Sequence, residues 1–382
     1  SGPDDMANAI AVDATGSAYV TGETLSSAVN FPVAVGPDLS FNFGSDAFVA
    51  KVVPSGATLA YCGYIGANGG ESGNGIAVDS AGCAYVTGSA HPLLDNQGQP
   101  CLPVFPTVVG PDLTWNGSSD AFVAKVASDG SSLLYCGYIG GSAYDQTYGI
   151  AVDSAGCAYV TGDTLSTEAT FPVKVGPDLT YHPMTGSLGY GRDAFVAKVD
   201  ASGSDLVYCG YIGGSEDDIG YGIAVDAAGN TYVTGETHAA QSSGLSTFPV
   251  LNWPYRKASQ TDAFVTKVLP SGAGLAYSGF IGGGGTDGGR GIAVDAAGCA
   301  YITGTTNSHD LPTVVGPDLI WNFSEDVLVA KVPANPIIYG PEITSLSPPS
   351  ISAYDPDFTL TVFGTGFAEG ALVNFNYETI SE

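Results

Sequence analysis

The amino-acid sequence predicts an all-β fold built from five copies of one four-stranded antiparallel unit. A segment of the type GIAVDSAGCAYVTG occurs five times, beginning at residues 9, 75, 149, 222 and 291. A block of the type DAFVAKV follows each segment, and a block of the type LxYCGYIG follows the first four of these. The blocks interleave Val, Ile, Tyr and Phe with Ala, Gly and Thr, which is strand composition, and no stretch keeps a 3.6-residue apolar period.

The four strands can be placed in the second copy. Strand A covers 76–79, strand B 84–88, strand C 120–126 and strand D 133–140. A tight turn joins A to B, because Asp79 can accept backbone N–H bonds and Gly82 can take a positive φ. Gly56 marks the turn between C and D of the first copy in the same way. The connection from B to C is long and variable.

The way in which the copies assemble follows from their need to bury both sheet faces. A four-stranded unit cannot do this alone, and radial packing of repeated units solves the problem while leaving only short sheet edges. We therefore predict a five-bladed β-propeller of four-stranded antiparallel blades over residues 1–340, with strand A innermost and a ring that closes without a swapped strand. A linear β-solenoid is the rival, but its rungs are usually much shorter than this repeat of 64–74 residues.

The charge of the chain limits its partners. It has 10 Lys and Arg against 38 Asp and Glu, for a net charge of −28. Such a surface repels nucleic acid and anionic membranes, so neither is an expected partner. No apolar run reaches the roughly 18 residues that span a bilayer, so we expect no membrane insertion. The first residues read as the middle of a repeat, so we expect that a leader or a longer N-terminal region precedes them.

The cysteines predict an oxidising location. Six of the seven stand at repeat-locked positions, which favours disulfides and an extracellular or cell-surface protein. Their spacing and the scarcity of histidine argue against a zinc–thiolate site.

Two disulfide schemes fit the spacing. One joins consecutive copies, as Cys62–Cys83 and Cys136–Cys157, and the other stays within a copy, as Cys83–Cys136 and Cys157–Cys209. The absence of cysteine at both Asn230 and Ser278 favours the second scheme. Strands B and D flank C, however, about 9.5 Å apart, and a disulfide tolerates Cα separations only up to about 7 Å, which favours the first. Either scheme leaves three cysteines over, which suggests intermolecular pairing.

Acidic residues precede or begin strand A in each copy. The candidates for a metal site are Asp5, Asp145, Asp218 and Asp287, which would gather near the mouth of a central channel. Calcium prefers several oxygen ligands, so a calcium site is one interpretation, and turn formation by Asp beside Gly is the other. No cofactor is required by either.

The remaining polar positions predict structure and not catalysis. A Lys stands five residues after the Asp that begins each strand C, and we expect these lysines to bond to the A–B turn aspartates or to carbonyls. We find no GxSxG, HExxH or P-loop motif, so we expect no catalytic residues and no enzyme. Aromatic residues of the B–C loops either stack on sugars or fill gaps between blades; these are Phe41, Trp115, Tyr181, Trp253 and Trp321.

The blocks IAVDSAGCAYVTG, DAFVAKV and LxYCGYIGG together resemble the bacterial SBBP-type β-propeller repeat, which is akin to NHL-type repeats. Residues 341–382 resemble the start of an IPT/TIG immunoglobulin-like domain, a partial β-sandwich. The resemblance implies a propeller and secretion, and it implies no catalytic residues.

The sequence thus predicts a structural or adhesive β-propeller module of a secreted or cell-surface protein. Its expected partners are other copies of itself, other surface proteins or glycans. The alternative is a carbohydrate-binding module or part of a polysaccharide-active enzyme.

Overall fold

The computed structural model describes residues 4–99, 101–102, 104–183, 191–238, 248–253, 261–312, 315–316, 320–321, 324–336, 342–347 and 361–365. Every regular element in these ranges is a strand, which confirms the all-β fold. The described residues contain no helix that is long and apolar enough to cross a membrane. The chain divides into two compact regions, Ser1–Asn335 and Pro336–Glu382.

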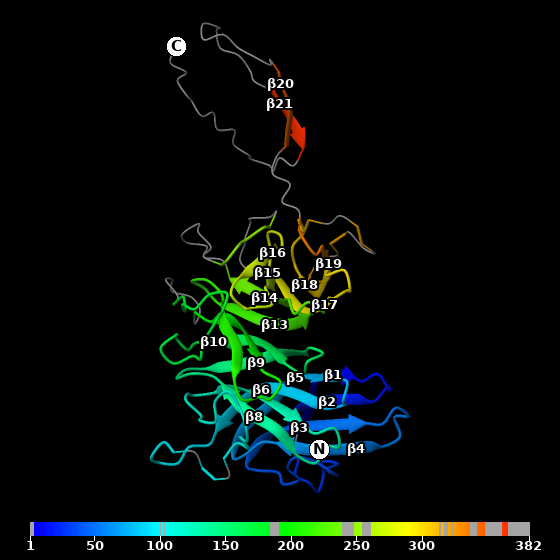
Figure 1. Ribbon diagram of the computed structural model, residues 1–382, viewed down its shortest axis with the longest axis vertical. Coiled ribbons are helices and arrows are strands. Elements are labelled where there is room, and N and C mark those ends of the chain that lie inside the picture. Colours follow the sequence, from blue (N-terminus) through cyan, green and yellow to red (C-terminus); the bar gives the residue numbers. More distant parts are fainter. Residues whose placement is uncertain are drawn as a thin grey trace. The chain divides into compact units, whose positions relative to one another are not determined.

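The strands of the first region form five antiparallel sheets in chain order (Figure 1). Sheet 1 contains β1 (Asp5–Val12), β2 (Ala18–Thr24), β3 (Gly44–Val52) and β4 (Leu59–Ile65). Sheet 2 contains β5 (Gly69–Val78), β6 (Ala84–Pro92), β7 (Asp120–Val126) and β8 (Leu133–Ile139). Sheet 3 contains β9 (Asp145–Val152), β10 (Ala158–Thr164), β11 (Asp193–Val199) and β12 (Leu206–Ile212). Sheet 4 contains β13 (Asp218–Val225), β14 (Thr231–His238), β15 (Thr261–Val268) and β16 (Leu275–Ile281). Sheet 5 contains β17 (Asp287–Val294), β18 (Ala300–Thr306) and β19 (Asp326–Val332).

Each sheet pairs its strands in the predicted order A–B–C–D, for example β9–β10–β11–β12. A short parallel pairing of Gly44 with Gly69 also joins β3 to β5. The predicted A–B turn forms as expected, because Asp79 Oδ1 accepts the backbone N–H groups of Ala81 and Cys83 at 3.0 and 2.9 Å. Gly82 completes this turn with a φ of +80°.

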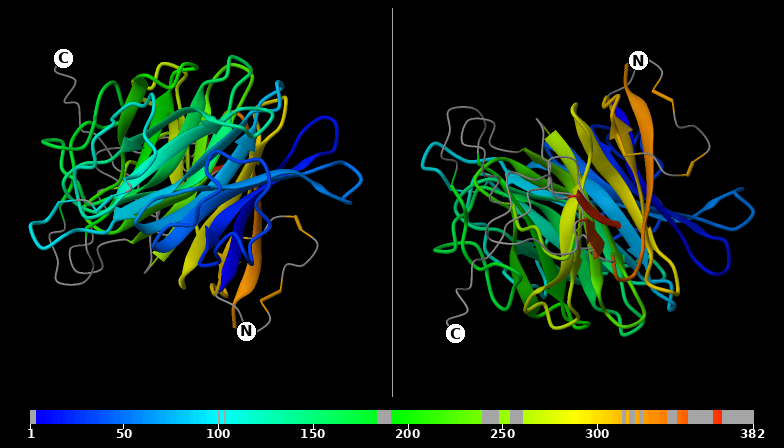
Figure 2. Two further views of the ribbon diagram at one scale, coloured as in Figure 1. Left: turned by 90° about the horizontal axis from the view of Figure 1, so that it is seen from below. Right: turned by 90° about the horizontal axis from the view of Figure 1, so that it is seen from above.

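Successive sheets pack face to face, and their first strands β1, β5, β9, β13 and β17 contact one another in that order. Figure 2 shows this succession in colour, from blue through green to orange. We call the face that carries the second-strand tyrosine, such as Tyr19, the outgoing face of a sheet. The opposite face carries the first-strand isoleucine, such as Ile76, and is called the incoming face. One apolar cluster joins Tyr19 and Val49 of sheet 1 to Ile76 and Phe122 of sheet 2, and equivalent clusters fill the next three junctions.

The two end faces of this succession are exposed. On the incoming face of sheet 1, Ile10 is 67% exposed, and on the outgoing face of sheet 5, Val329 is 63% exposed. These two faces therefore do not bury those side chains against one another. The antiparallel sheets of the sequence prediction are confirmed, whereas the closed five-bladed ring stays a prediction.

The structure contains none of the four disulfides of the two predicted schemes, because all seven cysteines are free thiols. Cys62 packs with Phe48 and Tyr64 on the incoming face of sheet 1. Cys83 packs with Tyr85 in the cluster between sheets 2 and 3, so the two thiols of the expected Cys62–Cys83 bond lie in different junctions. The same holds for Cys136 and Cys157, which belong to the clusters before sheet 2 and after sheet 3. The disulfide argument for an oxidising compartment therefore loses its support.

The second compact region contains one antiparallel pair, β20 (Glu342–Ser347) with β21 (Thr361–Thr365). The rest of the predicted immunoglobulin-like segment at 341–382 lies outside the described residues.

Candidate functional site

Each A–B turn carries an Asp, a Tyr and a Lys in contact. In sheet 2, Tyr85 Oη donates to Asp79 Oδ2 at 2.9 Å, and Lys125 Nζ lies 3.3 Å from the same oxygen and 4.6 Å from the centre of the Tyr85 ring. Burial opposes ionisation of Asp79, but the hydrogen bonds from Cys83 N–H and Tyr85 outweigh it and lower the pKa of the carboxyl. The Lys–Asp bonds expected from the sequence are confirmed, since equivalent ion pairs form at Lys51, Lys198 and Lys331. Because the same ion pair recurs from sheet to sheet, we assign it a structural role.

Three of the predicted metal ligands, Asp145, Asp218 and Asp287, bind the loop before their own strand, and Asp5 binds the end of the second strand. Asp145 Oδ2 accepts the N–H of Gly141 at 2.7 Å and the hydroxyl of Ser166 at 2.9 Å, and its other oxygen accepts from Thr164. Asp287 likewise accepts from the N–H of Gly283 at 2.8 Å. Asp5 and Asp218 make equivalent bonds to Ser26 and Gly214.

The calcium site at these four aspartates stays a prediction. They begin the first strands of four different sheets. Both oxygens of Asp145 accept hydrogen bonds, whereas Oδ1 of Asp218 and Oδ1 of Asp287 have no hydrogen-bond partner among the described residues. Calcium takes six to eight oxygen ligands. No group of three or more His, Cys, Asp or Glu side chains that could hold a metal occurs in the described part of the chain. The arrangement favours turn formation.

The structure brings three of these carboxylates close to a third-strand aspartate of the preceding sheet; the pairs are Asp145 with Asp120, Asp218 with Asp193 and Asp287 with Asp262. Asp120, at the start of β7, accepts the N–H of Asn116 at 2.8 Å and is fully buried. Burial raises the pKa of Asp120 to about 7, opposed by that N–H bond and aided by the charge of Asp145. Burial likewise raises the pKa of Asp46 to about 6, opposed by the N–H bond from Asn42 and aided by the charge of Asp38. Burial, aided by the charge of Asp46, raises the pKa of Glu71 to about 8. Sequence reasoning noted the aspartate at the start of every strand C but missed this pairing across the sheet junction.

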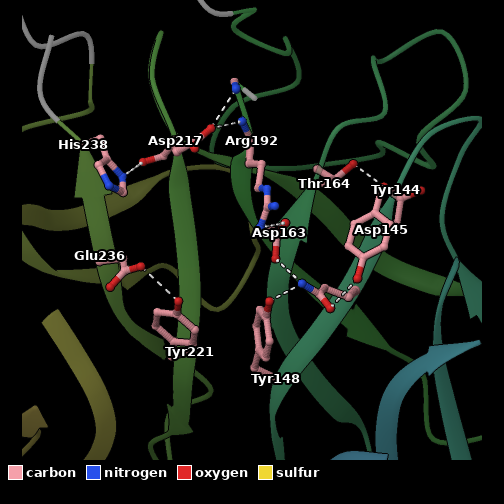
Figure 3. A network of polar contacts seen from close by, with 12 residues as sticks. Tyr144, Asp145, Tyr148, Asp163, Thr164, Arg192, Asp217, Tyr221, Glu236 and His238 are labelled. Carbon is pink, nitrogen blue, oxygen red and sulfur yellow. Dashed lines mark hydrogen bonds and ion pairs between the residues drawn. The ribbon is translucent and has the colours of Figure 1, made fainter. Parts of the chain in front are cut away.

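A second polar feature breaks the repeat, which makes it the candidate site for a specific function. Its polar and aromatic side chains lie on sheets 3 to 5 and differ between the copies. Tyr148, Tyr221 and Arg290 stand where sheets 1 and 2 have Asn, whereas Asp163 and Glu236 stand where sheet 1 has Glu23 and sheet 2 has Ser89. We call this set the central polar cluster. It consists of Tyr144, Gln146, Tyr148, Asp163, Arg192, Tyr221, Glu236 and Arg290. Figure 3 labels six of these residues, which are Tyr144, Tyr148, Asp163, Arg192, Tyr221 and Glu236.

Asp163 lies at the centre of the β9–β10 half of this cluster. Its carboxylate lies 3.6 Å from Arg192 Nη1 and accepts from Gln146 Nε2 at 3.2 Å. Gln146 also bonds to Tyr148 and accepts from Tyr144 Oη at 3.1 Å. Burial raises the pKa of Asp163 to about 6, although Arg192 and Gln146 act in the opposite direction.

The other half of the cluster lies on sheets 4 and 5. Tyr221 Oη donates to Glu236 Oε1 at 3.0 Å, and Arg290 Nη2 lies 3.1 Å from the other oxygen of Glu236. The Arg290 guanidinium also lies 4.1 Å from the centre of the Tyr221 ring, which is 5.1 Å from the ring of Tyr148. Chemically, the cluster offers planar hydrogen-bonding groups beside aromatic faces. The sequence could have indicated this cluster, because the residue types at these positions differ between the repeat copies.

The loop aromatics of the sequence prediction lie elsewhere. Phe41 packs on Tyr64 at a ring distance of 5.9 Å, and Tyr181 packs on Tyr211 at 6.0 Å. Trp253 is buried against Tyr277, and Trp115 packs onto the core between sheets 1 and 2. These four side chains fill gaps in the cores. Trp321 contacts the ring of His309 at 6.2 Å.

A comparison with known protein families supports the repeat. Residues 137–168 and 208–240 match the β-propeller repeat SBBP. No curated protein matches the chain in sequence.

Several solved structures align with this chain at low similarity. A luciferin-regenerating enzyme is 11% identical at a TM-score of 0.33, over 79% of this chain and 85% of that one. A GH43_1 enzyme from Xanthomonas citri complexed with xylotriose is 11% identical at 0.35, over 85% and 86%. BamB from Moraxella catarrhalis is 11% identical at 0.27, over 78% and 73%. Likeness at this level assigns no activity. The chain is therefore an all-β protein that carries β-propeller repeats of the SBBP type at residues 137–168 and 208–240.

Proposed function

We propose that this protein is a structural or adhesive module that works outside the cell or on its surface. The observation that carries the proposal is the use of the repeated polar side chains. Asp79, Tyr85 and Lys125 bond within one turn, and Asp145 holds its own loop, so the positions common to all copies maintain the sheets and their junctions. A net charge of −28 supports a soluble module that meets its partners through loops and end faces.

Surface labelling of intact cells tests the location. An antibody raised against the full chain should label unpermeabilised producing cells, or it should detect the protein in the culture medium. Labelling that requires permeabilisation would place the protein inside the cell and refute the proposal.

The second candidate function is glycan binding, and the central polar cluster favours it. Aromatic faces beside carboxylate and guanidinium groups are the chemistry that stacks on and hydrogen-bonds to a sugar ring. Arg290 is 49% exposed, so part of the cluster is open to solvent.

A glycan array with purified full chain tests this candidate. Arg290→Ala should abolish any specific signal, because it removes the partner of both Glu236 and Tyr221. Lys174→Ala is the matched control, since Lys174 is a similarly exposed cation that pairs with Asp205. A signal that survives Arg290→Ala, or that both variants lose equally, contradicts glycan binding at the cluster.

A further inference from the structure

The outgoing face of sheet 5 is the end of an otherwise regular series. Its Val327 and Val329 are 77% and 63% exposed. The equivalent side chains of the four earlier sheets are fully buried; these are Ala47, Val49, Ala121, Val123, Ala194, Val196, Ala263 and Val265. Tyr301 is 38% exposed, whereas its four equivalents Tyr19, Tyr85, Tyr159 and Tyr232 are at 0%. The residues are therefore of the kind that packs between sheets, but nothing in the described chain covers them.

The incoming face of sheet 1 is the opposite end. Ile10 is 67% exposed, whereas Ile76, Ile150 and Ile223 are 7–9% exposed in the junctions. Val12 is 61% exposed. An apolar cluster of Phe31, Phe48, Ala50, Cys62 and Tyr64 lies on this face and draws its buried members from sheet 1 alone. In sheet 2 the equivalent residues share one cluster with the outgoing face of the preceding sheet. The sheet 1 cluster is half of a junction.

The polar contacts of a junction are also left open at both ends. Tyr19, Tyr85 and Tyr232 each donate from Oη to the Asp of their own turn at 2.9–3.0 Å. The same Oη atoms lie 3.2–3.3 Å from the turn carbonyl of the next sheet, at Gly82, Gly156 and Gly298. Tyr301 Oη donates to Asp295 at 3.0 Å within its own turn, and the matching carbonyl of sheet 1 belongs to the exposed Gly16. Gly56 likewise meets open space, whereas Gly130, Gly203 and Gly272 lie against a tyrosine of the preceding sheet.

The two end faces therefore complement one another, and we propose that they join two copies of this chain head to tail. The outgoing face of sheet 5 in one copy would pack on the incoming face of sheet 1 in the next, with Tyr301 Oη beside the Gly16 carbonyl. Repeat equivalence supports a second copy as the occupant, because the same residue types already form four such junctions within the chain. A heterologous contact of this kind continues as a filament unless its rotation closes a ring.

The inference deepens the proposed structural role by naming the partner, and it rests on that role. The two are tested separately, because surface labelling concerns location whereas the contact can be measured on purified protein. The net charge of −28 makes copies repel one another, so association should strengthen as salt screens that repulsion.

The test uses two variants that each block one end of the full chain. Ile10→Lys blocks the incoming face and Val329→Lys blocks the outgoing face, and both change side chains that are exposed in one copy. In sedimentation velocity, the unmodified protein should form assemblies that grow with concentration and with NaCl, and each variant alone should stay monomeric. An equimolar mixture should form heterodimers and nothing larger, because only one intact contact remains. Leu134→Lys, at an exposed apolar position of β8 that is 47% exposed, should assemble like the unmodified protein.

Each contrary outcome overturns the inference. Unmodified protein that stays monomeric at all concentrations shows that the faces join no second copy; if Ile10→Lys then lowers Tm, the ends close on one another within one chain. Assembly that persists in both variants, or a mixture that yields no heterodimer, shows that other surfaces bind. Circular dichroism and Tm of the variants, expected to match the unmodified protein under monomeric conditions, exclude misfolding as the cause.

Discussion

Asp193 and Asp218 belong to successive sheets, and their carboxyl groups converge on Gly213. A Cβ at Gly213 would lie 2.7 Å from Asp193 Oδ1 and 3.0 Å from Asp218 Oδ2. Both side chains are at most 1% exposed. Burial, aided by the charge of Asp218, raises the pKa of Asp193 to about 9, and burial raises the pKa of Asp218 to about 8. Two buried carboxyl groups thus meet at one junction, and their raised pKa values favour protonation of the pair.

This pair predicts how stability depends on pH. Because the folded-state pKa of Asp193 exceeds the unfolded value of about 3.9, the folded state binds the proton more tightly between about pH 4 and pH 9. The free energy of unfolding should therefore fall as pH rises through this window, by on the order of 1 kcal/mol per pKa unit of displacement at one site. The turn aspartates, such as Asp79, have lowered pKa values and contribute stability that is lost as pH falls below about 4. Thermal melts should show a maximum Tm near the acidic end of this window.

Asp193→Asn isolates the contribution of the pair. The substitution removes the titrating group but keeps the shape of the side chain. The decline of Tm between pH 5 and pH 9 should therefore be shallower than in the unmodified protein. Asp205→Asn is the control, because Asp205 is 67% exposed and pairs only with Lys174. Equal slopes in all three proteins would contradict a shared, protonated carboxyl pair.

Two turn glycines share a positive φ but differ in what surrounds them, which makes them a matched test of sheet packing. Gly130 and Gly56 both have positive φ, +78° and +72°, but a Cβ at Gly130 would lie 2.2 Å from Cγ of Tyr61, whereas a Cβ at Gly56 meets nothing within 4 Å. Gly56→Ala should cost about 1–2 kcal/mol from the left-handed backbone. Gly130→Ala should cost about 1–3 kcal/mol more from overpacking. Urea denaturation measures both, and equal costs would contradict the predicted contact between sheets 1 and 2.

The equivalent valines of sheets 3 and 5 test how the series ends. Val196 is fully buried and Val329 is 63% exposed. Val196→Ala should lower the free energy of unfolding by about 2 kcal/mol, since burial of a valine contributes about 1.5–3 kcal/mol. Val329→Ala should change it little in dilute, monomeric protein. A large cost at Val329 under those conditions would mean that the face is covered within one chain.

Thiol chemistry checks the corrected cysteine assignment. All seven cysteines are free, and burial raises the pKa of Cys62 to about 11, so that side chain should react slowly with a thiol reagent. In the native protein, the half-buried Cys101 should react before the buried Cys62, Cys136 and Cys209. In denaturant without reductant, all seven should react. A lower count would show that a disulfide forms after all.

Chelation tests the remaining metal prediction. Because the oxygens of Asp145 are already bound by Gly141, Thr164 and Ser166, calcium has few free ligands there. Tm should therefore be the same in EDTA and in excess calcium. A rise with calcium, as mass action requires of a bound ligand, would restore the calcium site.

The sequence by itself determined the local structure of this protein. The alternation of apolar and small residues located the strands, and the Asp and Gly of each tight turn, such as Asp79 and Gly82, located the hairpins. It also determined the Lys–Asp bonds, because Lys125 and Asp79 recur at fixed positions that place them at one end of a four-stranded sheet. These features depend on neighbours within one copy, and a repeat displays those neighbours directly.

Only the tertiary structure decided what meets across the sheet junctions. It separated Cys62 from Cys83, paired Asp193 with Asp218, gathered Tyr221 and Arg290 beside Glu236, and left the two end faces exposed. A strand pattern of period two assigns side chains to two faces, but it does not state which face meets the next sheet or at what height. The junction contacts depend on how sheets joined by long loops settle against one another, because burial and desolvation act between residues far apart in the chain.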